Sequence, residues 1–597
     1  MNYKRKIGRL EKKVNNYKRM VMLLSQNKIA GVSNILSTAL RNGASADTIC
    51  TKLHQAISGT YRPRSGWTEK EFDITFLIKA LGGPRLLYAL QKADKYPSLT
   101  TLRVRKVIPE LLTSVGVPNK NEIRKNMKSF LGEKGRQPPK NIKVGQVFMM
   151  DGVAVEESIR YDHSQKSLLG FCREHSSHIK KVVESIGDLQ NTANALYPSD
   201  SSVEPTCHCG KDATVLGIAP VTDEENYHVV PLVLSTSCKT EKAKEIQNWV
   251  ETALEEYHTS PWGAQRHGEV ASLSPDGESS FRKLRNLICL TQDLDPSSAL
   301  GQVLCKLAGL NCRTGRNGII GTCDPKHIVK RFATMFRSPV GIQVGDVNIT
   351  RYDTHQALQE LMDPKAAASL LNPADKQNVP KAVNLIQSLH KVSTKKPKHP
   401  TPSVHSRIKA VGFVAKVLSF FLFPFIDVTM SLSEQIKSLS TYAHLVTALY
   451  RIHRLGFLTS ALLADSQAIV KSILFNLARL QLANADIKYY ILFEGTDRLE
   501  NVFSHARTQD HARNFDILQL AHKLSIGAEI DAIFQRYPDL NRGHVRRNLI
   551  NAQGVDHINP KSWIGNVRVG DVDIHKEYTA GRDEANKLMV EQFGQVK

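Results

Sequence analysis

The sequence predicts an α/β protein in which a mixed sheet with flanking helices is interrupted by a long all-helical segment. Short apolar runs rich in strand-forming residues lie at 147–150, 168–172, 213–219, 228–235, 268–273 and 318–323. Runs of this length between turn residues are typical of buried strands. Helical patterns alternate with the later runs, as expected of a mixed sheet with helices on both faces. Between residues 338 and 486 the strand patterns nearly vanish, which indicates an inserted helical domain.

The charge of the chain bears most directly on its partners. Its 597 residues carry 80 Lys and Arg against 57 Asp and Glu, so the formal net charge is +23. Such an excess favours a polyanion as partner, most simply nucleic acid. The basic N-terminus lacks the apolar segment of a signal peptide, and the apolar run 417–426 is too short to cross a bilayer. We therefore expect no membrane partner, and roughly three or four domains at this length.

The cysteines are nine in number and scattered, which suits a reducing compartment. Cys207 and Cys209 flank His208, and Cys238 is the next candidate ligand along the chain. A structural zinc site needs four ligands, so the sequence leaves open whether Cys207 and Cys209 bind zinc.

The N-terminal region, 1–45, contains a short heptad seam with basic residues between its members. The seam predicts either a coiled coil that dimerises the protein or a simple amphipathic helix. Its members are Ile7, Leu10, Val14, Tyr17, Val21 and Leu24.

Residues 46–140 are expected to form a helical, helix-turn-helix-like DNA-binding region. A capping box begins at Thr68, and Gly82-Gly83-Pro84 is a stop signal. The last short helix carries Arg103, Arg105 and Lys106, the side chains we expect to contact DNA. A small solvated bundle is the alternative. The basic stretch 120–143 is interpreted as a linker that follows a phosphate backbone.

Three acidic residues follow or adjoin predicted strands. Asp151 ends the first apolar run, and Asp276 follows the run at 268–273. Glu500 lies on a helix that begins after Gly495-Thr496-Asp497, with Glu494 as a rival in the same stretch. Carboxylates fixed at strand ends suit a divalent cation, which prefers oxygen ligands. The alternatives are aspartates that open turns and a glutamate on the surface of an amphipathic helix.

Together these stretches resemble the P-element and THAP-type transposases, and more distantly the hAT group. The matching residues, spread over about 100–510, are MMDGVAVEESIRYD with LLGF after it, SPDGESS, CDPKHIVKRF and TDRLENVFSHAR. The resemblance implies a ribonuclease H-like core with a helical insertion before its last acidic residue. The core would comprise 141–337 and 487–540, the insertion 338–486, and 541–597 would be a C-terminal tail with no assigned role.

The resemblance also implies an activity and its partners. Asp151, Asp276 and Glu500 would hold two Mg²⁺ or Mn²⁺ ions for phosphodiester hydrolysis and strand transfer at transposon ends. The partners would be double-stranded DNA with terminal repeats and further copies of the chain, as a homodimer or higher oligomer, in the nucleus. Basic residues near the site would hold phosphates, or form a solvated basic face: Lys326, His327, Lys330, Arg331 and Arg507.

Two departures from the family pattern stand out. No cysteine precedes Cys50, so a THAP zinc finger is absent from the sequence given, and no GxxxxGK[ST] motif occurs, which leaves the use of GTP open. Two other functions stay possible: a domesticated DNA-binding protein without catalysis, and a nuclease acting on RNA or RNA–DNA hybrids. Convergence of the three carboxylates on one pocket would favour the metal-dependent activities over the first of these.

Overall fold

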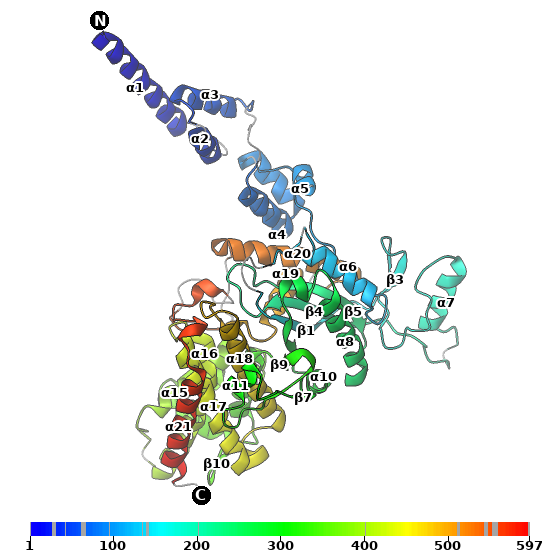
Figure 1. Cartoon of the computed structure of the whole chain (residues 1–597), viewed down its shortest axis with the longest axis vertical. Helices are drawn as coiled ribbons and strands as arrows, with labels where there is room; N and C mark the ends of the chain where they lie inside the picture. The colour runs from blue at the N-terminus through cyan, green and yellow to red at the C-terminus, as the bar shows by residue number, and fades with distance from the viewer. Residues whose placement is uncertain are drawn as a thin grey trace. The chain divides into compact units, whose positions relative to one another are not determined.

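The computed structural model describes residues 2–26, 32–41, 43–60, 67–94, 96–133, 135–138, 143–200, 202–399, 401–509, 514–541, 547–551 and 559–594. The chain divides into two compact units. The first comprises Met1–Ile108 with Arg507–Arg513, and the second comprises Pro109–Ala506 with Asn514–Lys597. Their elements are labelled in Figure 1.

The first unit begins with a three-helix cluster made of α1 (Asn2–Gln26), α2 (Val32–Arg41) and α3 (Ala46–Ile57). Leu23 and Leu24 near the end of α1 pack against Ile35, Ile49 and Leu53. Nearer the N-terminus the seam is exposed: Ile7, Leu10, Val14, Tyr17 and Val21 each expose about half of their surface. An exposed apolar seam of this kind could pack against a helix of another copy of the chain. The coiled coil stays a prediction.

The rest of the first unit is α4 (Glu69–Asp94) and α5 (Leu99–Arg105), which pack together. The predicted capping box is confirmed, because the Thr68 amide donates to the Glu71 carboxylate at 2.7 Å and the Glu71 amide donates to Thr68 Oγ1 at 3.3 Å. The predicted stop is a kink inside α4, where Gly83 adopts a φ of 80° that only glycine takes easily. The helix-turn-helix role of these helices stays a prediction.

Helix α6 (Lys120–Leu131) shows that the linker expected at 120–143 was wrong over its first half. Asn119 and Glu122 form a capping box, and Ile123, Met127 and Phe130 are buried on one face. The helix packs against β5 (Val230–Ser237) and α8 (Ala243–Thr259), so it belongs to the second unit with the sheet. The expected region 46–140 is thus divided between the two units.

A five-stranded mixed sheet organises the second unit, in the order β5-β4-β1-β6-β9. Strand β1 (Gln146–Ala154) pairs antiparallel with β4 (Asp212–Pro220), which pairs antiparallel with β5. On the other side β1 pairs parallel with β6 (Val270–Pro275), which pairs parallel with β9 (Ile320–Gly321). The sheet is therefore a three-strand meander extended by two strands parallel to the first.

The first apolar run after β1 does not join this sheet. Residues 168–172 were predicted to be a core strand, but β3 (Ser167–Leu169) pairs with β2 (Arg160–Asp162) in a hairpin and forms an isolated bridge to Val182. The hairpin and α7 (Ile186–Leu196) form a small satellite on residues 155–211 with its own apolar cluster of Leu168, Phe171, Leu196 and Cys207. The satellite is therefore inserted between β1 and β4, the first two strands of the sheet along the chain.

Helices cover both faces of the sheet. Phe148 of β1 meets Tyr257 of α8 edge to face at 5.5 Å, and α8 packs against α10 (Ser279–Cys289). On the other face Leu499 of α19 (Asp497–Thr508) lies against Gly217 of β4, and α20 (Ile517–Arg536) packs against β5. Smaller elements complete this part: α9 (Ala264–His267), β7 (Gln292–Asp293), α11 (Ala299–Leu304), β8 (Arg313–Thr314) and α12 (Pro325–Arg337).

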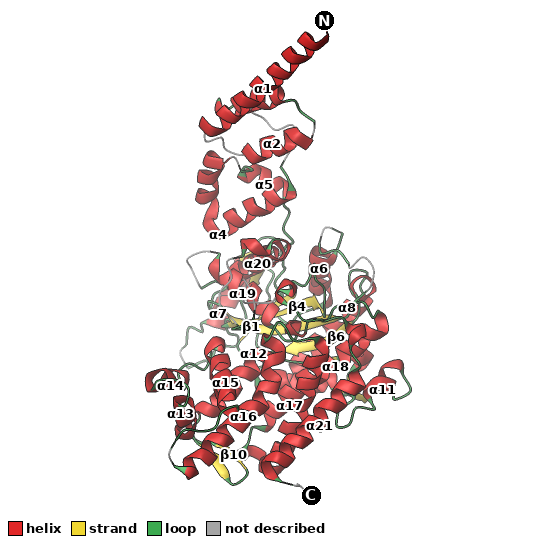
Figure 2. Ribbon diagram, turned by 90° about the vertical axis from the view of Figure 1, so that its left-hand side faces the viewer, coloured by secondary structure: helices red, strands yellow, loops and turns green. Residues whose placement is uncertain are grey.

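A helical block follows α12 and packs on the β9 side of the sheet through α18 (Ser460–Ala483). Figure 2 shows the block together on one side of the sheet, away from α19 and α20. Its apolar core is continuous with that of the sheet. Its other elements are β10 (Ile342–Val344), β11 (Val347–Ile349), α13 (Arg351–Gln359), α14 (Pro364–Leu370), α15 (Val379–Ser393), α16 (Pro402–Ile426) and α17 (Leu432–His453).

The described part of the C-terminal segment belongs to this block. Helix α21 (Ile574–Phe593) packs along α17, and Ser440 Oγ donates to the Tyr578 carbonyl at 2.6 Å. Helices α16 and α18 are long and apolar enough to cross a membrane, but 78% and 72% of their most apolar windows are buried inside the protein. Among the described residues, the apolar character of these two helices is thus accounted for by the core of the block.

Candidate metal centre at the carboxyl ends of the strands

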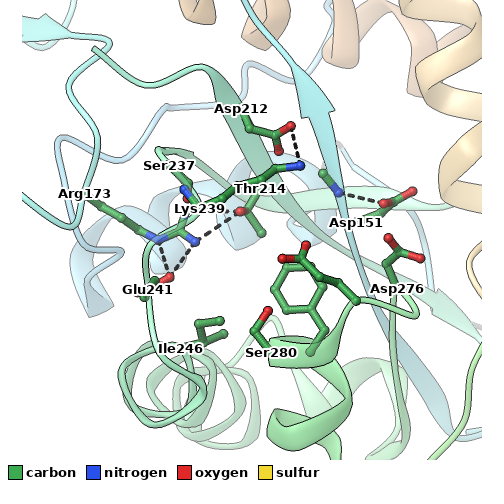
Figure 3. A pocket seen from close by; sticks show the side chains of 13 residues that line it. Asp151, Arg173, Asp212, Thr214, Ser237, Lys239, Glu241, Ile246, Asp276 and Ser280 are labelled. Atoms are coloured by element: carbon green, nitrogen blue, oxygen red, sulfur yellow. Dashed lines mark hydrogen bonds and ion pairs between the residues drawn. The ribbon is translucent and has the colours of Figure 1, made fainter. Parts of the chain in front are cut away.

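The parallel register of β1 and β6 brings Asp151 and Asp276 side by side. Met150 is the register partner of Pro275, and the Asp276 amide donates to the Met150 carbonyl at 2.9 Å. The residues that follow on each strand are therefore neighbours. Asp151 was predicted at the end of its strand but lies inside β1, where it is partly buried. Both side chains line one pocket, as Figure 3 shows.

A third aspartate, which sequence reasoning did not assign to the site, lies after the next strand. Leu273 of β6 is the partner of Gly321 of β9, and Asp276 and Asp324 each lie three residues beyond this pair. Asp324 Oδ1 accepts from the Lys326 amide at 2.7 Å and caps α12, while Oδ2 has no hydrogen-bond partner among the described residues. The available signal was the same pattern of apolar run, aspartate and helix that identified Asp276.

Glu500 reaches these aspartates from the facing helix. Side chains alternate along a strand, so Asp151 shares the Met149 side of β1, and Met149 is paired with Gly217, which Leu499 of α19 contacts. Gly495, at a φ of 92°, brings the preceding loop against Asp324: a Cβ there would lie 2.5 Å from the Asp324 Cα. This close approach fixes the start of α19 directly beside β9.

The carboxylates of Asp276, Glu500 and Asp324 lie close enough to Asp151 to act on its pKa. The pKa of Asp151 is raised well above the ordinary value, first by burial and then by the charges of Asp276 and Glu500, with Asp324 adding to them. The Gly152 amide donates to the Asp151 carboxylate at 2.7 Å and offsets part of the shift. Crowded carboxylates of this kind repel one another until a cation neutralises them.

The positive charge of Lys326 balances part of the negative charge of the acidic residues at this site. Its ammonium pairs with Asp497 and with Glu500 Oε2, the latter at 2.6 Å, and its side chain is only 11% exposed. Burial acts to lower the pKa of Lys326, but the neighbouring carboxylates outweigh it and hold the pKa above its ordinary value. Lys326 was predicted to hold phosphate, whereas in this structure its ammonium is occupied by carboxylates.

Asp324, His327 and Glu500 form a group suited to a cation, since one possible ligand atom of each lies within 4.8 Å of the others. His327 Nδ1 is 3.9 Å from Asp276 and 4.0 Å from Asp324 Oδ2, and it is a buried atom with no hydrogen-bond partner among the described residues. Two orphaned polar atoms beside several carboxylates fit a divalent ion, and the carboxylate oxygens are the ligands that suit Mg²⁺ and Mn²⁺.

The wall of the pocket opposite Asp276 is made of two ion pairs (Figure 3). Arg173 donates to Glu241 at 2.7 Å, and both side chains are almost fully buried. Lys239 pairs with Asp212 at 3.0 Å, next to Gly152. These pairs hold the satellite and the end of β5 beside Asp151, so the wall is positioned by charge.

A second, wider cleft adjoins Asp276, and basic side chains line it. Lys330 bonds Gln377 at 2.8 Å, and Arg331 pairs with Asp465 at 2.7 Å; both are partly exposed. Its basic and histidine residues are Arg282, His327, Lys330, Arg331 and Lys376. The cleft therefore offers positive charge next to the carboxylates.

Four other residues that were predicted to contact DNA lie outside the two pockets. In the first unit Arg103 and Arg105 are exposed on α5, while the Lys106 ammonium bonds Asp73 and lies 5.6 Å from the Phe76 ring. Arg507 is exposed near the end of α19.

Glu494, the rival to Glu500, is turned away from the aspartates. It is buried and accepts hydrogen bonds from Thr322, Ser472, Asn476 and Tyr489, between 2.8 and 3.0 Å. A carboxylate satisfied by four donors is a structural anchor, so Glu500 is the better candidate ligand of the two.

Comparisons with known proteins give one similarity. No protein-family model and no curated protein matches the chain. Among solved structures, the chain is similar to the Drosophila P element transposase strand transfer complex, with 13% identity and a TM-score of 0.48, over 85% of this chain and 99% of that one. Because a TM-score below 0.5 does not establish a common fold, the function has to be inferred from the residues of this chain.

Proposed function

We propose that the chain is a DNA transposase, or a transposase-derived nuclease, that cuts and joins phosphodiester bonds at the ends of a mobile element. The observation that carries the proposal is the gathering of Asp151, Asp276 and Asp324 at three adjacent strands with Glu500 facing them. The meander with two added parallel strands is also the strand order expected of a ribonuclease H-like core, with the helical block as its insertion.

Asp151, Asp276 and Glu500 would hold two Mg²⁺ or Mn²⁺ ions, with Asp324 and His327 as further ligands. When bound, such ions activate a water or a 3′-hydroxyl and stabilise the leaving oxygen at phosphorus. The protein's part is to hold the carboxylates close together, and bound cations would offset the raised pKa of Asp151. The Gly152 amide already favours the ionised form of Asp151, and the orphaned Asp324 Oδ2 is available as a ligand.

Double-stranded DNA would lie along the basic cleft beside Asp276. Lys330 and Arg331 are exposed enough to reach phosphates, and the net charge of +23 supports a polyanionic partner. Arg103, Arg105 and Arg507 would add contacts from the first unit. Terminal-repeat recognition, a dimer through the seam of α1 and a nuclear location remain parts of the same proposal.

The test is a nicking and joining assay with purified full-length protein, Mn²⁺ and terminal DNA from the flanking genomic sequence. Asp151→Asn, Asp276→Asn and Glu500→Gln should each lower the rate by at least 10³-fold without changing the melting temperature by more than a few degrees. Asp293→Asn is the matched control, because that carboxylate is 86% exposed and, among the residues that the structure describes, forms an ion pair with Arg313 alone. Cleavage that survives all three changes would refute the proposal, and activity on RNA instead of DNA would redirect it to a nuclease.

One observation favours the domesticated, non-catalytic alternative. The Lys326 ammonium already neutralises Glu500 and Asp497, so the site contains a substitute for a cation. If the protein binds DNA tightly but Mn²⁺ neither raises its melting temperature nor supports cleavage, the DNA-binding function stands and the catalytic one is rejected.

A further inference from the structure

Two cysteines and two histidines meet between the satellite and the sheet, away from the carboxylates. Cys172 and His175 follow β3, His208 precedes β4, and Cys238 directly follows β5. One possible ligand atom of each lies within 4.8 Å of all the others. These four residues come from three separate segments of the chain, so folding alone brings them together.

The contacts within the cluster converge on a single nitrogen. His175 Nδ1 lies 3.3 Å from Cys172 Sγ, 3.4 Å from Cys238 Sγ and 3.3 Å from His208 Nδ1. An imidazole nitrogen carries either one hydrogen or one lone pair, so at most one of these three contacts is a hydrogen bond. At least two of the three contacts are therefore not hydrogen bonds. A metal ion bound by all four residues would account for them.

The spacing fits a tetrahedral zinc ion. With Zn–S bonds of about 2.3 Å and Zn–N bonds of about 2.0–2.1 Å, neighbouring ligands lie about 3.5 Å apart for a sulfur–nitrogen pair and about 3.3 Å apart for two nitrogens. The three measured separations lie within about 0.2 Å of these values. Two sulfur and two nitrogen ligands are a donor set typical of structural zinc, and a poor one for Mg²⁺.

The backbone around the cluster is held independently of any ion. The Cys172 amide donates to the His208 carbonyl at 2.9 Å, and the Cys238 amide donates to the Glu174 carboxylate at 3.2 Å. These bonds preorganise the ligands. Zinc binding would displace the thiol protons of Cys172 and Cys238.

The cysteines singled out by the sequence were only partly the right ones. Cys207 is buried in the apolar cluster of the satellite, and neither Cys207 nor Cys209 belongs to the ligand group. The residue between them, His208, and the more distant Cys238 do belong to it. Cys172 and His175, spaced as C-x₂-H, are the signal in the sequence that was overlooked.

We propose that Cys172, His175, His208 and Cys238 bind one structural zinc ion that fastens the satellite to the end of β5. The satellite has only four buried apolar residues of its own in that cluster, and so small a core usually needs a metal or a covalent link. Two ligands adjoin pocket-wall residues: Cys172 precedes Arg173, and Cys238 precedes Lys239. The ion thereby also fixes the wall opposite Asp276.

The test is the metal content of full-length protein purified without added metal, measured by inductively coupled plasma mass spectrometry. We expect about one zinc per chain in the wild type, less than a fifth of that in Cys238→Ser, and a full complement in the control Cys209→Ser. Replacement of zinc by Co²⁺ should give intense tetrahedral d–d bands and a thiolate charge-transfer band, both lost in Cys238→Ser. If Cys238→Ser does not fold, the Co²⁺ spectrum of the wild type still shows whether a tetrahedral site with thiolate ligands is present.

Two results would overturn the proposal: wild-type protein free of zinc that also gives no tetrahedral Co²⁺ spectrum, or zinc retained at full stoichiometry in Cys238→Ser. The measurement is independent of catalysis, because Asp151→Asn should keep its zinc. Failure of the DNA-cutting function and failure of the zinc site are thus separate outcomes.

Discussion

Replacing Lys326 by methionine tests the electrostatics of the carboxylate site most directly. The ammonium is the shared partner of Asp497, whose side chain is 1% exposed, and Glu500, which is 32% exposed. Methionine keeps much of the length of the side chain and removes only its charge. The variant therefore leaves the acidic residues in place with one counter-charge fewer.

The expected loss of stability follows from burial. Removing one partner of a buried ion pair costs about 3–5 kcal/mol. Asp497 keeps Arg547 at 2.6 Å, and Glu500 is partly solvated, so the lower end, about 3 kcal/mol, applies. The second unit has roughly 480 residues, and an unfolding entropy of about 2.1 cal/mol/K per residue gives about 1 kcal/mol per degree. The melting temperature of Lys326→Met should fall by about 3 °C.

Differential scanning calorimetry without divalent ions measures this loss, and Lys330→Met is the matched control. Lys330 lies one turn further along α12, and its one side-chain partner within the described part of the chain is neutral, Gln377, so its loss should cost less than about 0.5 °C. Mn²⁺ should raise the melting temperature of Lys326→Met more than that of the wild type, because the ion replaces the missing counter-charge. Equal losses in the two variants, or no difference in the response to Mn²⁺, would refute the electrostatic account.

Three further predictions concern Asp324, Gly495 and His267. Asp324→Asn keeps an N-cap for α12 but removes the charge, so the affinity for Mn²⁺ measured by calorimetry should fall at least about tenfold, with no change in Asp293→Asn. Gly495→Ala puts a Cβ 2.5 Å from the Asp324 Cα at a φ of 92°, and should cost about 3 kcal/mol in urea unfolding; a cost below about 1 kcal/mol would show that α19 is not fixed there. Burial lowers the pKa of His267 to about 4, so the unfolded chain binds a proton below about pH 6.5 that the folded chain does not. Stability should therefore fall as the pH drops, by about 2 kcal/mol at pH 5, and His267→Gln should lose that part of the difference between pH 7 and pH 5.

The parts of the site that sequence reasoning could reach are those with a local signal. Asp151 and Asp276 each follow an apolar run, and the parallel register then makes them neighbours. Glu500 had a weaker signal, a helix start after Gly495, and its distance from the strands in sequence gave no evidence of contact. Lys326 had the signal of a basic helix, which predicts a phosphate contact as readily as the carboxylate pairs that the structure shows.

Two of the fold predictions were wrong because composition was given more weight than the local pattern or the tertiary contacts. The many basic residues after residue 120 suggested a linker, although Asn119 and Glu122 form a capping box and Ile123, Met127 and Phe130 share one helical face. The run at 168–172 has the apolar character of a core strand, but Leu168 and Phe171 are buried in the satellite, and of its leucines and Phe171, Leu169 alone packs with the core of the sheet. An apolar run in the sequence predicts that its side chains are buried, but it does not predict which apolar core of the protein they join.

Glu494 shows how a helical block can be inserted without loosening the site. Its carboxylate joins β9, through Thr322, to α18, through Ser472 and Asn476. The next residue is Gly495, whose backbone lies against Asp324, and Glu500 follows within two turns of helix. Helix α18 therefore returns from the block to the sheet and delivers the last acidic residue through buried hydrogen bonds. Because this connection is fixed at β9, the length of the block between β9 and α18 has little influence on where Glu500 lies, which is the physical condition for carboxylates so distant in sequence to form one site.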